Sequence, residues 1–464
     1  MAGYGRAEPR MTGPDDHVAI VGAGFSGTLL AINLMRHDGP RATLIERRAD
    51  QWARGVAYSA AHPSHLLNVR AANMSALPDD PDHFLRWLEG QGSGTRGSFV
   101  PRTTYGRYLH EMLEEAIATS AGRLTRIEGE VSALDSDARG VRLTLADGLM
   151  VTADLSVLAL GNLPPHTPPG LVPEALPAQV YRPDPWASDI AEDLHPDETV
   201  VLIGTGLTAV DAALLIDARG FTGRIIALSR RGLRPHRHVD GLPPVQGVLT
   251  KPPGELADIV AHVRSRAGEG DWRSAVDELR PVTQMMWAAA SAGQRAQFLR
   301  HLRPFWDVHR HRLAPPVADR IDALVRKGRL RFASGKIIDA EGQGASVRLR
   351  WRPRGTGDTI VTPTARLVNC TGPQGDLLRS DEPLLQYLMA EGSIRPDPLR
   401  LGLDVNAQSQ VIDRNGRPND RLHAIGPMTR GGLWEVVAVP DIRQQAWTLA
   451  RHLSNAQWVG GEGL

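Results

Sequence analysis

A glycine-rich turn that occurs twice constrains this chain more than any other feature. The first copy reads Gly22-Ala23-Gly24-Phe25-Ser26-Gly27, between an apolar strand pattern at 18–21 and a helical pattern that starts at Thr28. A strand that ends in G-x-G-x-x-G and opens into a helix brings a diphosphate against bare backbone amides, where the helix macrodipole favours negative charge. Residues 41–45 read as the next strand, and the carboxylate of Glu46 at its end is placed to accept hydrogen bonds from ribose hydroxyls. The alternative, a tight turn without a ligand, would not need all of these features together.

The second copy differs from the first at the end of its second strand. An apolar strand pattern at 200–203 leads into Gly204-Thr205-Gly206-Leu207-Thr208-Ala209, and a helical pattern follows. The next strand, at 224–228, ends in Ser229-Arg230-Arg231 instead of an acid. Guanidinium groups and a hydroxyl suit a 2′-phosphate, which a carboxylate would repel. We therefore predict an adenine dinucleotide with a free ribose at the first turn and NADPH at the second, with a solvated basic turn as the alternative for the two arginines.

The two halves repeat one plan. In each half, short alternating strands follow the dinucleotide unit, and an apolar strand then ends at a glycine, Gly161 in the first half and Gly372 in the second. The second half carries an insertion at about 241–316, in which 255–264, 272–279 and 294–302 have helical apolar spacing. This organisation predicts an α/β protein with two Rossmann-like dinucleotide-binding domains, β-meanders and a helical insertion. The expected domains are 17–165 with 366–464, and 166–365, after a flexible N-terminus at 1–16.

Composition narrows the function further. With 53 basic and 52 acidic residues, the formal charge of the 464-residue chain is +1, so neither a nucleic-acid partner nor a highly charged tail is expected. The single cysteine, Cys370, excludes an internal disulfide, a dithiol redox pair and a cysteine-based zinc site. The polar start lacks the apolar core of a secretory signal, and no stretch is apolar enough to span a bilayer. We expect a cytoplasmic protein without a membrane partner and leave homo-oligomerisation open.

Four further segments carry a resemblance to a known family. They read Gly55-Val56-Ala57-Tyr58 with His65-Leu66-Leu67-Asn68-Val69 to Met74-Ser75; Pro101-Arg102 to Tyr105-Gly106; Phe305-Trp306-Asp307-Val308-His309-Arg310-His311-Arg312; and Ile425-Gly426-Pro427 through Trp434-Glu435 to Pro440-Asp441-Ile442-Arg443. In this order of motifs the chain resembles the bacterial FAD-NAD(P)-binding proteins, which are akin to flavin-containing monooxygenases and to lysine and ornithine N-hydroxylases. The resemblance extends over residues 17–450.

The resemblance implies an FAD half built from both ends of the chain and an NADP half between them. The segment 65–75 would run beside the isoalloxazine ring, and Gly426 with the helix from Asp441 would cover the ribitol and the pyrimidine edge. Many relatives have an Asp after this glycine, and here Pro427 replaces it. The residues assigned to the two cofactors are Gly22, Gly24, Phe25, Ser26, Gly27, Glu46, Arg47, Val69, Met74, Ser75, Val131, Gly161, Gly204, Thr205, Gly206, Leu207, Thr208, Ser229, Arg230, Arg231, Gly426, Asp441 and Ile442.

FAD and NADPH on one chain imply hydride transfer from nicotinamide to flavin, which needs stacking and exclusion of water. Without a second cysteine, the electrons cannot go on to a dithiol. The N-hydroxylase resemblance instead implies a flavin C4a-hydroperoxide that delivers oxygen to the nitrogen of a small amine or amino acid, in a pocket sheltered from water. We place Asn68, His65, Trp434 and Glu435 nearest the flavin as catalytic candidates. Packing or loop hydrogen bonding is the alternative for Asn68 and Trp434.

Two basic runs leave other roles open. The cluster His309-Arg310-His311-Arg312 lacks the alternating carboxylates of a metal site, so we expect no metal there, and either an anion contact or a solvated helix end. Arg234, His236, Arg237 and His238 either hold the NADP diphosphate or face water. Among other functions, an NADPH-dependent flavin oxidase or oxidoreductase that inserts no oxygen is the main alternative. A non-catalytic nucleotide sensor is disfavoured, because a sensor needs only one nucleotide site.

Overall fold

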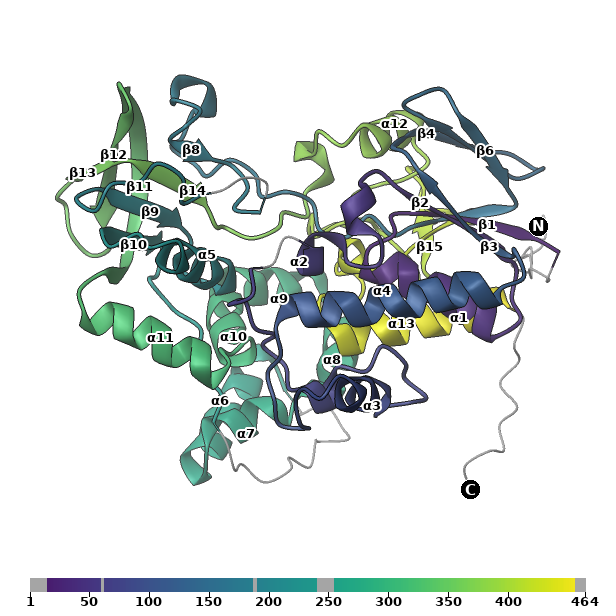
Figure 1. Ribbon diagram of the computed structural model, residues 1–464, viewed down its shortest axis with the longest axis horizontal. Coiled ribbons are helices and arrows are strands. Elements are labelled where there is room, and N and C mark those ends of the chain that lie inside the picture. The colour runs from purple at the N-terminus through teal and green to yellow at the C-terminus, as the bar shows by residue number, and fades with distance from the viewer. Residues whose placement is uncertain (1–14, 60–61, 187–189, 240–253, 455–464) are drawn as a thin grey trace.

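The protein, described by a computed structural model over residues 15–59, 62–186, 190–239 and 254–454, contains two large sheets side by side (Figure 1). The first is almost entirely parallel, and the second is mixed, with antiparallel pairing only along β11, β12 and β13. The first sheet has the strand order β15-β16-β7-β1-β2-β3, and only the pairing of β15 with β16 is antiparallel. Its strands are β1 (His17–Val21), β2 (Arg41–Glu46), β3 (Leu124–Glu128), β7 (Leu155–Leu158), β15 (Gln410–Ile412) and β16 (Pro418–Ala424). Strands from both ends of the chain therefore build one sheet, as the sequence predicts.

Helices cover one face of this sheet and a meander covers the other. The helices are α1 (Phe25–Arg36), α2 (Gly55–Ser59), α3 (His83–Gly90), α4 (Arg102–Thr119) and α13 (Val439–Leu453), and their apolar sides share one buried core with β1 and β7. The meander strands β4 (Val131–Ser136), β5 (Val141–Leu145) and β6 (Met150–Ala153) form a separate sheet, which packs with α12 (Pro383–Glu391) around a second core. Both faces of the parallel sheet are thus buried, which explains its nearly continuous apolar strands.

The second sheet has the order β13-β12-β11-β10-β9-β14-β8. Its strands are β8 (Tyr181–Arg182), β9 (Thr199–Ile203), β10 (Arg224–Ser229), β11 (Leu330–Gln343), β12 (Ser346–Pro353), β13 (Ile360–Thr364) and β14 (Arg366–Asn369), with α5 (Leu207–Ala218) and α11 (Pro315–Arg326) packed on it. The strand that begins at Arg366 pairs in parallel with β9, so the chain returns to the first half only after Asn369. The boundary expected at 366 is therefore too early, because the last apolar strand of the repeat completes the second sheet.

The insertion is helical, as its apolar spacing predicts. It contains α6 (Leu256–Glu269), α7 (Trp272–Asp277), α8 (Thr283–Ala289), α9 (Ala292–Gln297), a π-helical turn (Phe298–Leu302) and α10 (Arg303–Arg310). The predicted helix at 294–302 is thus divided between α9 and the π-helical turn. In Figure 1 these helices lie below and between the two sheets, next to the helices of the first half. Short 3-10 turns occur at Ala49–Gln51, Ala71–Asn73, Pro173–Ala175, Arg280–Val282, Leu377–Arg379 and Pro427–Thr429.

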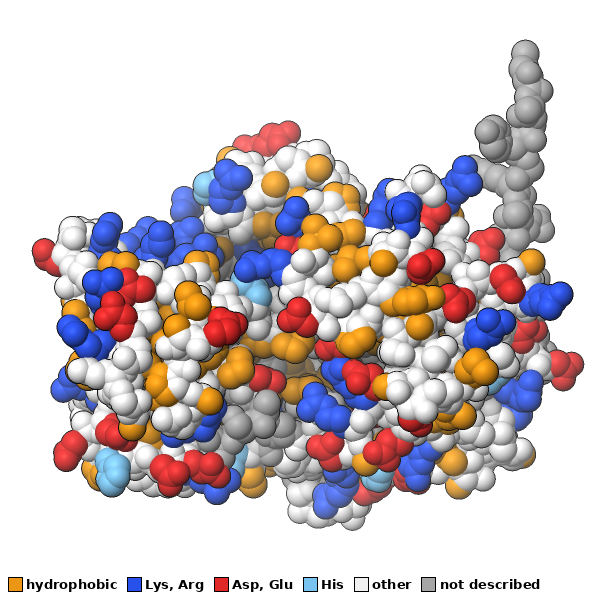
Figure 2. Space-filling view, turned by 90° about the horizontal axis from the view of Figure 1, so that it is seen from above, with side chains coloured by type: hydrophobic (Ala, Val, Ile, Leu, Met, Phe, Trp, Pro, Cys, Tyr) orange, Lys and Arg blue, Asp and Glu red, His pale blue; other side chains and the backbone are white. Residues whose placement is uncertain are grey.

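The two lobes face each other across a hollow near the middle of the molecule, where apolar and charged side chains are both visible (Figure 2). Most of the N-terminal segment 1–16 and the start of the predicted insertion lie outside the described residues. In the described part of the chain, no helix has both the length and the apolar character needed to cross a membrane.

Candidate active site

The first glycine turn closes tightly on the end of β7. Gly22 has φ +99°, and a Cβ at this position would lie 2.5 Å from the carbonyl oxygen of Ala159. A Cβ on Gly27 would lie 2.0 Å from the carbonyl oxygen of Gly22. At Gly24, in contrast, the nearest atom to an added Cβ is the Cα of Gly55, at 3.4 Å. Gly22 and Gly27 are thus required by the fold, while Gly24 keeps space in front of the N-terminus of α1, where a diphosphate fits.

Glu46 holds this turn from the end of β2. Its carboxylate is buried and accepts hydrogen bonds from the backbone amides of Ala23, at 2.9 Å, and Arg48, at 3.2 Å. Carboxylate oxygens have lone pairs beyond these two bonds, so the position fits the ribose role predicted for Glu46. The guanidinium of neighbouring Arg47 pairs with Glu130 and Glu382 instead, at 3.2 and 2.8 Å.

The C-terminal glycine meets the first turn across the whole length of the chain. Gly426 has φ +83°, and a Cβ there would lie 2.4 Å from Oγ of Ser26. Its amide donates to Oε1 of Gln445, a buried residue of α13, at 2.8 Å. Gln445 also donates to Oγ1 of Thr429 at 3.0 Å. The backbone at Gly426 is therefore fixed by Gln445, for which the sequence motifs predict no role, although Pro427 stands where many relatives have an acid.

Asp441 and Ile442 lie in the first turn of α13, beside this loop. Ile442 is buried in the core, whereas the carboxylate of Asp441 pairs with Arg280 of the insertion at 3.3 Å. Burial, and then the neighbouring carboxylate of Glu435, raise the pKa of Asp441 to about 7. The structure thus brings Asp441 into contact with the insertion, and Ile442 acts in packing.

The segment 65–75 forms much of the joint between the two halves. The buried ring of His65 uses both nitrogens: Nδ1 accepts from the amide of His62 at 3.2 Å, and Nε2 is 2.9 Å from the carbonyl oxygen of Asp211 in α5. Burial lowers the pKa of His65. Arg102 of α4 adds an ion pair with Oδ2 of Asp211 at 2.7 Å. Because both ring nitrogens are engaged, this geometry favours a structural role for His65 over the predicted catalytic one.

The rest of the segment separates into anchored and free groups. Met74 is buried, and Ser75 is tied to α13, because its carbonyl accepts from Arg443 at 2.6 Å. The side-chain amide of Asn68 has no hydrogen-bond partner among the described residues, although its carbonyl accepts from Nε2 of His238 at 3.0 Å. Asn68 is therefore the candidate of this segment that is available to a ligand. Val69 is half-buried against the core of the first half.

The second glycine turn repeats the geometry of the first. Gly204 has φ +128°, and a Cβ there would lie 2.3 Å from the carbonyl oxygen of Cys370. A Cβ on Gly206 would meet no described atom within 4 Å, so the space before α5 is open. Cys370 thus occupies the place that Ala159 has in the first half. It is buried, and burial raises the pKa of its thiol, which fits packing and not redox chemistry.

The basic residues after β10 differ in their partners. Ser229 bonds Thr205 of the glycine turn, with 2.9 Å between the hydroxyl oxygens. Arg230 is exposed and forms no ion pair with the described part of the chain, while Arg231 lies over the ring of Phe305 at 5.2 Å. Arg234 instead pairs with Asp322 at 2.8 Å. The free guanidinium at the turn is therefore that of Arg230, which fits the predicted selection of a 2′-phosphate.

The remaining cofactor candidates surround these two turns. Phe25 packs against Tyr58 and Tyr105 at the start of α1, Val131 is buried at the start of β4, and Gly161, with φ +71°, follows β7. Leu207 and Thr208 open α5. Phe25, Gly161, Leu207 and Thr208 follow the carboxyl ends of parallel strands, whereas Val131 begins the antiparallel meander. The contacts of all five residues with a cofactor stay predictions.

Trp434 and Glu435 join the C-terminal loop to the insertion. The indole of Trp434 stacks on Trp287, with ring centroids 4.7 Å apart, and its buried Nε1 has no hydrogen-bond partner in the described chain. Glu435 is buried with φ +68°, and its carboxylate accepts from Nε1 of Trp306 at 2.8 Å and from Nε of Arg310 at 3.2 Å. A left-handed non-glycine residue costs about 1–3 kcal/mol and occurs often at functional sites. These contacts hold Glu435 in that conformation. Trp306 and Arg310 belong to a motif of the sequence, but their spacing does not predict a contact with Glu435, which is more than 120 residues away in the chain.

The other residues of the 309–312 cluster are used within the fold. Arg312 is buried and forms a two-pronged bond with Asp277, at 2.9 Å for each nitrogen, while Nδ1 of His309 is 2.7 Å from the carbonyl oxygen of Phe305. The described residues contain no group of three or more His, Cys, Asp or Glu that could hold a metal ion.

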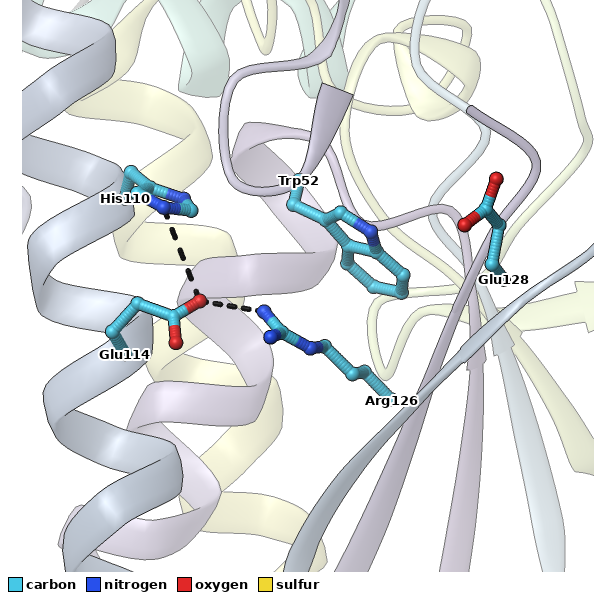
Figure 3. Close-up of a pocket in the computed structure, with 5 residues that line it drawn as sticks. All are labelled: Trp52, His110, Glu114, Arg126 and Glu128. Carbon is cyan, nitrogen blue, oxygen red and sulfur yellow. Dashed lines mark hydrogen bonds and ion pairs between the residues drawn. The ribbon is translucent and has the colours of Figure 1, made fainter. Parts of the chain in front are cut away.

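A hollow of about 660 Å³ lies between α4 and β3 (Figure 3). It is next to the first glycine turn, because the amide of Ala53, the neighbour of Trp52, donates to the carbonyl oxygen of Ala23 at 2.8 Å. Its lining consists of Trp52, His110, Glu114, Arg126 and Glu128. Arg126 pairs with Glu114 at 2.5 Å and lies over the ring of Trp52, so its charges are largely matched within the protein.

Comparison with known proteins agrees with this arrangement. Residues 19–163 match the model of a family described as FAD-NAD(P)-binding. The chain is also similar to the uncharacterized protein YdhS of Escherichia coli (strain K12), with 26% identity over 218 residues. This similarity covers 43% of the chain and 39% of that relative, so it spans well under half of the curated protein.

Solved structures of N-hydroxylases share the fold over nearly their whole length. The ornithine N-hydroxylase of Kutzneria sp. 744 is 16% identical with a TM-score of 0.65, and the similarity covers 95% of this chain and 99% of that one. The cadaverine monooxygenase DfoA of Erwinia amylovora, solved with FAD bound, is 14% identical with a TM-score of 0.67 and 95% coverage of both chains. The predicted resemblance is thereby confirmed: the chain has the fold of these two-dinucleotide flavoproteins, and its first half matches an FAD-NAD(P)-binding family.

Proposed function

We propose that this protein is an NADPH-dependent FAD monooxygenase that transfers one oxygen atom to the nitrogen of an amine. The observation that carries the proposal is the pair of glycine turns, in which Gly24 and Gly206 each cap the N-terminus of a helix on its own sheet. The match of residues 19–163 to an FAD-NAD(P)-binding family and the N-hydroxylase fold support it. We include a cytoplasmic location and molecular oxygen as second substrate in the proposal.

Bound FAD would accept a hydride from NADPH and activate oxygen. The chain's own residues select the nucleotide, orient the cofactors and shelter the reaction site from water. Arg230 binds the 2′-phosphate that distinguishes NADPH from NADH, and Glu46 accepts from the ribose of FAD. Asn68 offers an uncommitted amide close to the joint between the halves. The loop containing Trp434 and the insertion close the site from water, which protects an activated oxygen from premature release as peroxide.

The experiment that tests this function separates it from its closest alternative. Purified FAD-loaded protein is mixed with NADPH in air, and hydrogen peroxide is measured per NADPH consumed, with and without candidate amines. A monooxygenase releases less peroxide when its amine is present and forms the hydroxylated product. An NADPH oxidase releases the same peroxide with every amine, and that result would replace our proposal with the alternative of an oxidoreductase that inserts no oxygen.

A further inference from the structure

A cavity of about 530 Å³ lies inside the helical insertion, and Trp434 of the C-terminal loop forms part of its wall. We call it the insertion cavity and define it by Ile259 and Val263 of α6, Met286 and Trp287 of α8, Phe298 of the π-helical turn, and Trp434. Its size is within the range of about 300–1,000 Å³ that is typical of small-molecule sites. It is distinct from both glycine turns.

The lining of the insertion cavity is apolar and aromatic. The apolar side of α6 faces it, although none of the described side chains of this helix is fully buried. Trp287 is held in the wall by a hydrogen bond from its Nε1 to the carbonyl oxygen of Gly431, at 2.8 Å. Apolar surface in a protein is normally buried by packing. A ligand that filled this cavity would bury its apolar lining, and this burial would contribute substantially to the free energy of binding.

The charged side chains that line the cavity have one sign, although Glu435 and Glu255 are bonded to the lining residues Trp306 and Gln294 from outside the lining. Of the described residues that line it, none is Asp or Glu, whereas Arg264 and Arg295 both belong to the lining. The guanidinium of Arg295 is bound to the carbonyls of Trp287 and Ala288, at 2.9 and 3.1 Å, while Arg264 forms no ion pair with the described chain. A cationic ammonium group would find no carboxylate among the described lining residues, and the two nearby carboxylates are already bonded to Trp306 and Gln294, whereas an anionic group would find Arg264.

The cavity is connected to the proposed reaction site by Trp434. Its buried Nε1 lacks an acceptor in the described chain, and an unpaired buried N–H is costly unless a ligand supplies the acceptor. The next residue, Glu435, is bonded to Trp306, which also lines the cavity. A molecule in the cavity would thus contact the same loop that closes over the flavin end of the first half.

We propose that the insertion cavity binds a large hydrophobic group of the substrate. The end of this group that lies near Arg264 is neutral or anionic. The inference rests on the proposed function and revises its substrate class, because a free small amino acid or diamine would leave the cavity empty.

Binding of straight-chain carboxylates tests the proposal without any turnover. The FAD-loaded protein, without NADPH, is titrated with the series from pentanoate to nonanoate, and binding is followed by tryptophan fluorescence and calorimetry. Each added methylene should tighten binding about fourfold, since burial of one methylene contributes about 0.8 kcal/mol to the binding free energy. Octylamine should bind more weakly than octanoate. Affinity that does not depend on chain length, or tighter binding of octylamine, would overturn the proposal.

Two pairs of neighbouring substitutions locate the binding. Val260 and Met286 line the cavity, whereas Ala261 and Met285 are exposed beside them and do not line it. Val260→Trp and Met286→Trp should each weaken octanoate binding at least tenfold, and Ala261→Trp and Met285→Trp should leave it unchanged. Retained FAD and an unchanged circular dichroism spectrum show that each variant is folded, and the second pair serves if Val260→Trp does not fold. Equal effects within both pairs would place the ligand elsewhere.

The outcome is separable from that of the proposed function. Loss of chain-length dependence together with intact amine hydroxylation would reject the cavity and leave the monooxygenase. Octanoate binding that depends on chain length, without any oxygen transfer, would reject the monooxygenase and leave the cavity as a binding site. Concentration-dependent dimerisation that Val260→Trp abolishes, with no binding of the carboxylates, would assign the cavity to a second copy of the chain and overturn the proposal.

Discussion

Nε1 of Trp306, in the helical insertion, donates to the carboxylate of Glu435, in the loop before α13, at 2.8 Å. The same carboxylate pairs with Arg310, and both members of this ion pair are largely buried, with side-chain exposures of 11% and 5%. The insertion is therefore fastened to the FAD half by charged and aromatic groups that have little access to water. Its position over the C-terminal loop follows from a few specific contacts.

Replacing Glu435 should destabilise the protein strongly. Glu435→Gln keeps an oxygen for Trp306 but leaves the buried guanidinium of Arg310 without its counter-charge, which costs about 3–5 kcal/mol. Thermal unfolding followed by circular dichroism measures the loss. Glu382→Gln is the control, because its partner Arg47 is more exposed and such pairs contribute about 1 kcal/mol or less. Equal effects of the two substitutions would show that the Glu435 pair is not important for stability.

Arg230 should control the choice between NADPH and NADH. One charge-assisted contact contributes roughly 1.5–3 kcal/mol, so Arg230→Ala should raise KM for NADPH about ten- to a hundredfold with little effect on NADH. Steady-state kinetics with both nucleotides measures this ratio. Arg234→Ala is the control, because this arginine is already paired with Asp322 and should leave the preference unchanged. A uniform loss of activity with NADPH and NADH would reject Arg230 as the selector.

Gly206→Ala should separate folding from nucleotide binding. An added methyl group meets no described atom within 4 Å, so the variant should fold and retain FAD. The methyl group would nevertheless occupy the space before α5, so KM for NADPH should rise at least tenfold. The corresponding change Gly204→Ala, where the Cβ would collide with Cys370, should prevent folding of the second sheet instead. Normal NADPH kinetics in Gly206→Ala would contradict this placement of the diphosphate.

Cys370→Ser should retain reduction of the flavin by NADPH. The thiol is buried behind Gly204, burial raises its pKa and so disfavours the reactive thiolate, and the chain has no second cysteine with which it could form a disulfide. Anaerobic loss of flavin absorbance after addition of NADPH measures the reaction. A folded variant that holds FAD but is no longer reduced would show that the thiol takes part in the chemistry.

Lowering the pH should reduce the stability of the folded protein, and protonation of His238 should account for part of this loss. Burial, together with Arg312 and Arg70, lowers the pKa of His238 to about 4, against the hydrogen bond to Asn68. The folded state therefore favours the neutral ring, and this contribution to stability is present above about pH 6.5 and is lost as the pH falls towards 4. His238→Gln should lose less stability than the native protein between pH 7 and pH 4, as measured by thermal unfolding. The same pH dependence in both proteins would exclude His238 as a contributor.

The sequence predicted the sheets well because their signals are local. Each glycine turn, its strand and its helix lie within a short stretch, and the collisions at Gly22 and Gly204 explain why only glycine fits those positions. The boundary at Arg366 was misplaced, because a short apolar strand reads the same in either sheet and only the pairing with β9 decides its membership.

The candidate site was harder to predict where it depends on long-range contacts. His65 was selected for its position in a motif, but its hydrogen bond to the carbonyl of Asp211 connects residues that are far apart in the chain. Gln445 was missed for the same reason, since nothing near it in sequence indicates that its amide fixes Gly426. The insertion cavity depends on how several helices pack, which apolar spacing does not specify.

The central claim is that two different dinucleotides bind this one chain and exchange a hydride. Anaerobic rapid mixing of the FAD-loaded protein with NADPH, followed through the flavin absorbance, tests it most directly. We predict fast and complete bleaching with NADPH and much slower bleaching with NADH. A protein that binds no FAD, or whose bound FAD stays oxidised in the presence of excess NADPH, would contradict the account.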